Sequence, residues 1–157
     1  MTKRDEAPDP VFGEVIYAYT RAQALADGVL VDASAPAREA GIRWPVAMTA
    51  AVFARYVRVP EQLAGWQDEK GRMWDVVWML RCGISGGNAK GRERLFKLLV
   101  NVPHDGALEP NERLDQRNPE RAPRAEAWDV LEVTLKAEVG PGDDGEPVIT
   151  VLLPGED

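Results

Sequence analysis

The segment Trp128–Leu153 constrains the fold most, because it contains two strands and the turn that joins them. Apolar and polar residues alternate from Trp128 to Val139 (WDVLEVTLKAEV), which is the pattern of a strand with one buried face. Gly140–Pro147 (GPGDDGEP) is dense in turn-forming residues, and Val148–Leu153 is rich in apolar and β-branched ones. The segment therefore predicts an antiparallel hairpin, whose apolar face must be covered by other elements.

Other stretches predict further strands and short helices. Val11–Tyr19 is rich in β-branched and aromatic residues, and both Val29–Asp32 and Leu95–Pro103 are strand candidates. Thr20 and Gln23 have the spacing of a capping box, which predicts a helix from Arg21 to Asp27 that ends at Gly28. Ser34 and Thr49 are expected to cap two more short helices.

The clearest helix is predicted over Arg72–Cys82 (RMWDVVWMLRC). Its apolar residues fall on two adjoining faces, with Trp74, Val77 and Trp78 on one and Met73, Val76 and Leu80 on the other. A helix that is apolar over so much of its surface is expected to be central and largely buried. Large aromatic side chains dominate cores and interfaces, so most of the five tryptophans in the chain are expected to be buried.

These elements predict an α+β fold: an antiparallel or mixed sheet of four to five strands, one central buried helix and several short helices. A chain of 157 residues fits one domain, which we expect to cover residues 11–157 after a flexible tail at 1–10. Residues 104–127 hold many charges and few large apolar side chains, so we expect a mobile polar segment there.

The charge and the cysteine content narrow the classes of partner and compartment. A net charge of −7 disfavours non-specific electrostatic binding to nucleic acid or to an anionic membrane surface. Cys82 is the only cysteine, so the chain cannot form an internal disulfide, which fits a reducing compartment. The charged segment Met1–Pro8 is unlike a signal peptide, and no stretch approaches the roughly 18 apolar residues of a membrane span. We therefore expect a cytoplasmic protein without a membrane partner.

Asp75 is the first candidate for a chemical role, because it lies among apolar residues of the predicted helix. A carboxylate in such surroundings has a raised pKa, which is how general acids arise. If the chain binds a small ligand, the candidate ligand-binding residues are Asp75, Arg72, Arg43 and Tyr19. The structural alternative is that Asp75 favours the positive end of the helix dipole, or pairs with Arg72 or Arg43.

A second candidate site consists of the basic residues Lys90, Arg92, Arg94 and Lys97. They could contact a phosphate or an acidic protein partner, although a solvated strand face is the simpler explanation. The preceding loop, Gly83–Gly91, departs from the spacing of a phosphate-binding loop and follows a helix instead of a strand. No nucleotide cofactor is therefore expected.

The sequence contains no catalytic or metal-binding signature. His104 is the only histidine, and with Cys82 it offers two soft ligands at most, so a zinc site is not expected. Cys82 follows an apolar helix face and is expected to be a small core residue. We therefore expect no catalytic residue, metal or cofactor, which disfavours an enzyme.

Four segments together resemble a known family: Tyr19–Asp32, Trp44–Thr49, Gly71–Met79 and Gly140–Thr150. It is an uncharacterised family, a domain of unknown function carried by plasmids, integrative elements and phages of Gram-negative bacteria. The resemblance extends from Val15 to Asp157 and implies a mobile-element setting, but it implies no activity, substrate or catalytic residue.

Three functions are compatible with these observations. The first is a mobile-element accessory protein that binds a host or mobile-element protein without catalysis, for instance to inhibit a host defence protein. The second is a small-ligand or nucleotide-binding protein, or an enzyme with an unfamiliar site. The third is a nucleic-acid-associated protein that uses the basic strand. An exposed aromatic patch would favour the first function, and a deep polar pocket the second.

Overall fold

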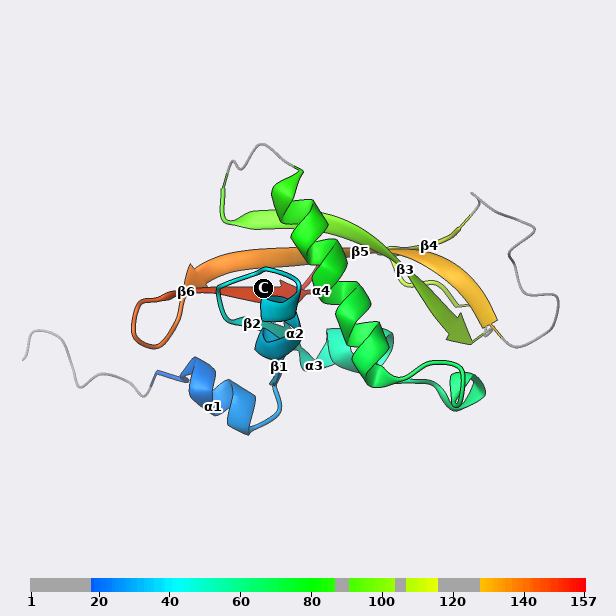
Figure 1. Ribbon diagram of the computed structural model, residues 1–157, viewed down its shortest axis with the longest axis horizontal. Coiled ribbons are helices and arrows are strands. Elements are labelled where there is room, and N and C mark those ends of the chain that lie inside the picture. Colours follow the sequence, from blue (N-terminus) through cyan, green and yellow to red (C-terminus); the bar gives the residue numbers. More distant parts are fainter. Residues whose placement is uncertain (1–17, 87–90, 104–106, 116–127) are drawn as a thin grey trace, which may run out of the picture.

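The computed structural model describes residues 18–86, 91–103, 107–115 and 128–157 (Figure 1). In this part of the chain, six strands form one open, mixed sheet, against which a long helix and several short ones pack. The α+β class is as predicted, and the sheet is larger than the expected four to five strands. The expected tail at 1–10 and most of the expected strand at 11–19 lie outside the described residues.

The strands follow the order β1-β2-β6-β5-β3 across the sheet, and β4 pairs with β5. Their bounds are Leu30–Asp32 (β1), Val46–Thr49 (β2), Glu93–Pro103 (β3), Glu112–Leu114 (β4), Trp128–Pro141 (β5) and Pro147–Leu152 (β6). The β2–β6 pair is parallel and the other pairs are antiparallel. Strand β5 is the centre of the sheet, because β3 pairs along one of its sides while β4 and β6 share the other.

The predicted C-terminal hairpin is confirmed by the pairing of β5 with β6, from Lys136 opposite Leu152 to Pro141 opposite Pro147. Side chains alternate along β6 as the pattern requires. Ile149 and Val151 belong to the main core, whereas Val148 and Leu152 lie on the other face of the sheet. One face of the hairpin therefore packs in the main core, and the other face lies on the opposite side of the sheet.

Strand β4 lies within the segment 104–127, where the sequence predicts a mobile polar segment without a strand. Glu112 pairs with Val133 and Leu114 with Leu131, so this short strand extends the sheet beside β6. Three residues are too few to show an alternating pattern, which is why the sequence gives no sign of it. Residues 104–106 and 116–127 lie outside the described residues.

The predicted capping box is present at helix α1 (Arg21–Ala26). The Thr20 hydroxyl accepts a hydrogen bond from the Gln23 backbone N–H, and the Gln23 side chain accepts one from the Thr20 N–H. Gly28 follows with a φ of 75°, the left-handed conformation that glycine favours after a helix. Helix α1 covers the face of the sheet that carries Val148.

Helix α2 (Ser34–Glu39) begins at the residue that was predicted to cap it, because its N-cap is Ala33. The Ser34 hydroxyl instead donates a hydrogen bond to the Val46 carbonyl on β2 and accepts one from the Val46 N–H. The serine therefore fixes the start of α2 against the sheet.

A π-helix follows β2. Thr49 caps α3 (Ala50–Val52) as predicted, since its hydroxyl accepts from the Val52 N–H. The chain then widens into the π-helix η1 (Phe53–Val57), and a 3-10 helix, η2 (Glu61–Leu63), comes next. Because π-helices are rare and are frequent at functional sites, the side chains of η1 are of special interest.

Helix α4 (Glu69–Ser85) is longer than predicted at both ends. Asp68 caps it by accepting from the Gly71 N–H at 2.6 Å. At the other end, Gly83 is helical although a loop was expected. A Cβ there would come within 2.8 Å of the Phe96 Cβ, so the glycine lets α4 pack closely on β3.

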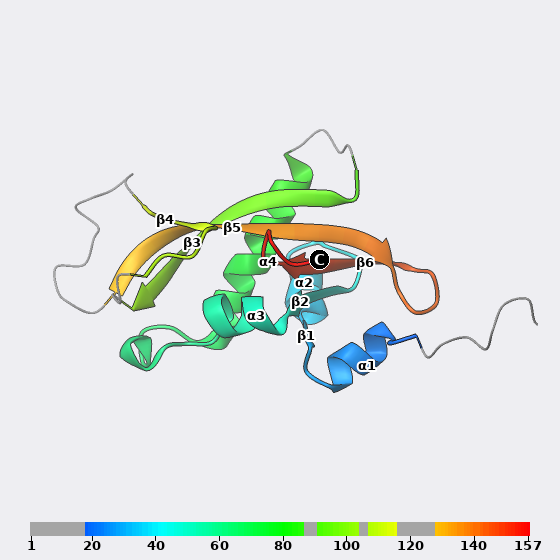
Figure 2. The ribbon, with the colours of Figure 1, turned by 180° about the vertical axis from the view of Figure 1, so that it is seen from behind.

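Helix α4 crosses β3 and β5 on one face of the sheet (Figures 1 and 2). Val76, Val77 and Leu80 are buried in the core against the sheet. The outer side of the helix is not covered, which corrects the prediction of a largely buried helix: Trp78 is 47% exposed. Cys82 is exposed as well, so it is not the core residue that was expected.

Candidate functional site

The four predicted ligand-binding residues do not form one pocket. Tyr19 lines a hollow beside α1 and donates to the Asp27 carboxylate at 2.8 Å, on the face of the sheet opposite α4. Arg72 and Asp75 are on α4, and Arg43 is exposed after α2. Among the described residues, no hydrogen bond or ion pair connects Arg43 with the other three.

Arg72 is buried and connects α4 to three other parts of the chain by hydrogen bonds. Its Nε donates to the Tyr56 carbonyl at 3.0 Å, and its Nη1 donates to the Asn101 carbonyl at 2.9 Å and to Gln67 at 2.7 Å. Burial lowers the pKa of Arg72, and the neighbouring Asp75 carboxylate partly opposes this. Desolvation raises the pKa of Asp75, against the opposing charge of Arg72. The direction for Asp75 is as predicted, but its carboxylate is at an exposed position of the helix.

The basic candidates do not share one surface. Lys90 lies outside the described residues, and Arg92 is exposed just before β3. Arg94 is opposite Ala137 of β5 and Lys97 is opposite Thr134, so their side chains lie on opposite faces of the sheet. Lys97 also pairs with Glu132 at 2.9 Å.

The tryptophans contradict the expectation that most are buried. Of the four whose side chains the structure describes, Trp44 is 46% exposed and Trp66 is 80% exposed. Trp78 is exposed on α4, and Trp74 one turn earlier is half-buried. Single exposed apolar side chains are normal, but adjoining ones can mark a binding surface, where tryptophan is enriched.

Trp74 lines a groove that has an apolar floor. The groove has a volume of about 610 Å³ and lies between α2, η1 and the first turns of α4. Its walls are formed by Ala35, Pro36, Glu39, Phe53, Asp68, Glu69, Lys70, Gly71, Met73 and Trp74. We call this feature the aromatic groove.

Stacking and charge give the aromatic groove its character. The rings of Trp74 and Trp78 stack, with centroids 6.0 Å apart and planes 17° from parallel, so Trp78 continues the aromatic surface along α4. The acidic residues at the walls are Glu39, Asp68 and Glu69, against one lysine, Lys70. The groove therefore joins an apolar floor to a negatively charged rim.

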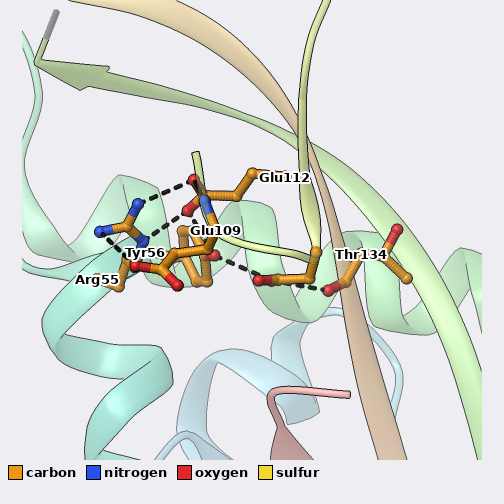
Figure 3. Close-up of polar contacts among 6 residues, drawn as sticks. Arg55, Tyr56, Glu109, Glu112 and Thr134 are labelled. Carbon is orange, nitrogen blue, oxygen red and sulfur yellow. Dashed lines mark hydrogen bonds and ion pairs between the residues drawn. The ribbon is translucent and has the colours of Figure 1, made fainter. Parts of the chain in front are cut away.

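On the other side of η1, a polar network surrounds the carboxylate of Glu112 (Figure 3). The Glu112 side chain is fully buried and accepts hydrogen bonds from Arg55, the Tyr56 hydroxyl and the Glu109 N–H. Asn111 extends the network by donating to the Tyr56 oxygen at 2.9 Å and to the Thr134 carbonyl at 3.1 Å. These residues, which we call the Glu112 network, connect η1 with β4 and β5.

The pKa directions show that Glu112 is held as a carboxylate. Burial alone would raise the pKa of Glu112, but hydrogen bonds from Arg55, the Glu109 N–H and Tyr56 outweigh it and lower the value. The hydrogen bond to Glu112 raises the pKa of Arg55. Burial, with the bond to Glu112, raises the pKa of Tyr56 to about 12. Every group in the network is paired in its usual charge state. The network therefore has a structural role: it holds η1 against β4 and β5.

Sequence reasoning missed both the Glu112 network and the groove. The network joins residues that are far apart in the sequence, and nothing in the local pattern around Glu112 marks it as buried. One feature of the sequence could have predicted the groove. Trp74 and Trp78 are four residues apart on a helix whose other apolar residues suffice to face the sheet.

The described residues contain no group of three side chains that could hold a metal ion. None of the described helices is both long and apolar enough to cross a membrane.

The fold and the site together define an open-sheet α+β protein with an aromatic groove on its helical face. The chain belongs to a family described as a family of unknown function (DUF6573), whose model matches residues 11–157. A search of curated proteins and a search of solved structures found no match.

Proposed function

We propose that this chain is a non-catalytic protein-binding module, and that its aromatic groove holds a basic, partly apolar segment of another protein. The observation that carries the proposal is the stacked pair of Trp74 and Trp78, which forms an exposed aromatic surface at an acid-rimmed groove.

The aromatic surface fits a protein partner because tryptophan is enriched among the residues that dominate protein–protein binding energy. Trp74 and Trp78 lie on a rigid helix, so little conformational entropy is lost when they are covered. Phe53 and Met73 add a floor into which an apolar side chain of the partner can insert.

The negative charge at the walls of the groove indicates that the partner segment is basic. Glu39, Asp68 and Glu69 outnumber the single Lys70 at the walls, so lysine or arginine residues beside the apolar anchor complement the rim. Arginine has the additional option of stacking on an indole ring.

We further propose the setting of this binding: a cytoplasmic accessory protein of a plasmid, integrative element or phage, with a host or mobile-element protein as partner. Inhibition of a host defence protein is the specific role we propose. This part rests on the resemblance of segments such as Gly71–Met79, which includes Trp74.

The test is selection of peptides from a random displayed library against the immobilised full chain. We expect enrichment of sequences that combine an aromatic or aliphatic residue with lysine or arginine. Trp74→Ala should weaken a selected peptide by about 30-fold, the loss typical of a tryptophan that dominates an interface. Glu39→Gln should weaken it by about threefold, and more at low salt than at high salt.

Trp66→Ala is the matched control, since Trp66 is more exposed than Trp78 but does not line the groove. It should leave the affinity unchanged. Enrichment of acidic peptides, or affinities that Trp74→Ala does not change, would contradict the proposal.

A small apolar ligand is the second candidate occupant, because the volume of about 610 Å³ is within the range of ligand pockets. Screening aromatic fragments by thermal shift separates the two candidates. Fragments that stabilise the wild type but not Trp74→Ala, with no peptide selected, would favour the ligand.

A further inference from the structure

Strand β3 is an edge strand with a regular set of free backbone groups. The Arg92 carbonyl accepts from the Val139 N–H at 2.8 Å, and pairing with β5 continues without a bulge from Glu93 to Pro103. Bonded and outward-facing positions alternate in such a pair, so the odd-numbered residues from Glu93 to Leu99 direct N–H and C=O away from β5. Among the described residues, no other strand pairs with this edge.

The free edge ends at Asn101. Its carbonyl also points away from β5, but it accepts a hydrogen bond from Arg72 Nη1 at 2.9 Å. A strand that added to this edge could therefore pair with residues 93–99 only. Long open edges normally recruit another strand unless they are blocked.

The side chains at the outward-facing positions favour association. Leu95 is 64% exposed and Leu99 is 48% exposed. Glu93 and Lys97 flank Leu95 on the same face of the strand, and both are mostly exposed. The edge thus presents a leucine between two opposite charges.

We propose that β3 pairs with β3 of a second copy of this chain, antiparallel about a two-fold axis at Leu95. Leu95 then lies opposite Leu95 of the partner subunit, and Glu93 of each copy lies opposite Lys97 of the other. Opposite charges directly across an antiparallel pair stabilise it, and the symmetric contact closes without forming a filament.

Charge complementarity also extends beyond the two edge strands. Lys97 pairs with Glu132 at 2.9 Å, and Glu93 pairs with Lys136 at 3.7 Å, within each copy. In the dimer, the Glu132–Lys97 pair of one copy meets the Glu93–Lys136 pair of the other, so that charges alternate in sign across the interface.

Other registers fit less well. An axis at Phe96 places Leu95 against Lys97, and an axis at Lys97 places two lysines opposite each other. A further shift requires the Asn101 carbonyl, which Arg72 already occupies. The axis at Leu95 is therefore the register that matches both charge and backbone.

The test is sedimentation equilibrium of the full chain up to about 100 µM, a concentration that populates any micromolar dimer. We expect a monomer–dimer equilibrium. Lys97→Glu should raise its dissociation constant at least about tenfold, because both symmetric pairs become Glu–Glu. The double variant Glu93→Lys with Lys97→Glu should restore it to within about threefold, since the interface pairs are complementary again.

The double variant also serves as the folding control, because within each copy it loses the contact with Glu132 that Lys97→Glu loses, and the Glu93–Lys136 contact as well. A monomeric wild type, or a dimer that Lys97→Glu does not weaken, would overturn the proposal. Trp74→Ala should leave the dimer unchanged, so this result is independent of the fate of the aromatic groove.

Discussion

The Glu112 network and the aromatic groove lie on either side of the π-helix η1 and differ in the kind of side chain that each one buries or exposes. In the Glu112 network, charged and polar groups are buried, and the Glu112 carboxylate is surrounded by donors. At the aromatic groove, the Trp78 ring is exposed to solvent and the Trp74 ring on which it stacks is half-buried. Buried polar groups must be paired if they are to be tolerated, whereas exposed aromatic rings contribute little to folding until something covers them. The first region therefore serves stability, and the second is the surface that we propose to bind a partner.

The two regions are connected through neighbouring residues of η1. Phe53 lines the groove, while Arg55 and Tyr56 point to Glu112. Arg72 adds a second connection, because it binds the Tyr56 carbonyl from within α4, the helix that carries Trp74. The rigid network thus supports one wall of the groove.

Removing the Glu112 side chain should reduce the stability of the protein most strongly. Glu112→Ala leaves the Arg55 guanidinium and the Tyr56 hydroxyl without their acceptor, at a cost of about 3 kcal/mol of unfolding free energy. The loss is at the lower end for a buried ion pair, because Arg55 is 34% exposed and water replaces part of the bond. Urea denaturation measures it. Glu109→Ala, at an exposed partner of Arg55, should change stability by less than about 0.5 kcal/mol, and an equal loss in both variants would refute a special role of Glu112.

Acid should weaken the network by protonating Glu112. Since hydrogen bonds lower its pKa in the folded state, the unfolded chain binds this proton more readily. The stabilisation is complete above about pH 4.3, the value for an unfolded glutamate, and is lost as the pH falls through the folded pKa. Glu112→Gln should be less stable than the wild type at pH 7, and the difference should shrink below about pH 4 in urea titrations. A difference that does not depend on pH would contradict this assignment.

Tyr56→Phe should have a smaller effect, about 1–1.5 kcal/mol of unfolding free energy. The hydroxyl donates to Glu112 and accepts from Asn111, but each partner keeps another hydrogen bond. Thermal and urea unfolding would both report the loss. No change in stability would mean that water replaces the hydroxyl.

Trp78→Ala should have a smaller effect on stability than Tyr56→Phe, about 0.5–1 kcal/mol, which is the contribution of its stacking on Trp74. The same variant should weaken a peptide selected for the groove by several-fold, because it removes the outer half of the aromatic surface. Unfolding and peptide titration of one preparation measure the two effects. A loss of stability like that of Glu112→Ala would make Trp78 a folding residue instead.

The sequence was most informative where neighbouring residues determine the structure. The capping box at Thr20, the Thr49 cap and the hairpin of β5 with β6 all depend on local chemistry or on a long alternating pattern. The outer side of α4 was misjudged because a helix that is apolar on all sides looks the same whether one side faces a core or a partner.

The candidate site was harder to predict, because tertiary contacts create it. Glu112 occurs in a polar stretch of the sequence. Its role as a buried acceptor depends on Arg55 and Tyr56, which only the fold brings beside it. Arg72 was singled out as a ligand-binding candidate, but its Nε and Nη1 bond within the protein, to the carbonyls of Tyr56 and Asn101 and to the Gln67 side chain. Neither the π-helix nor strand β4 has a local pattern that distinguishes it from an ordinary helix or loop.

The position of β6 between β2 and β5 has a consequence for how the molecule folds. Val46 pairs with Ile149, so the β1–β2 pair has no neighbour in the sheet until the residues of β6 become available. Contacts between positions so distant in sequence form slowly, because closing the long intervening loop costs entropy before the pairing stabilises it. During synthesis, the sheet therefore remains in two parts with unpaired edges. A chain truncated before residue 147 would keep both edges open and would be prone to aggregate.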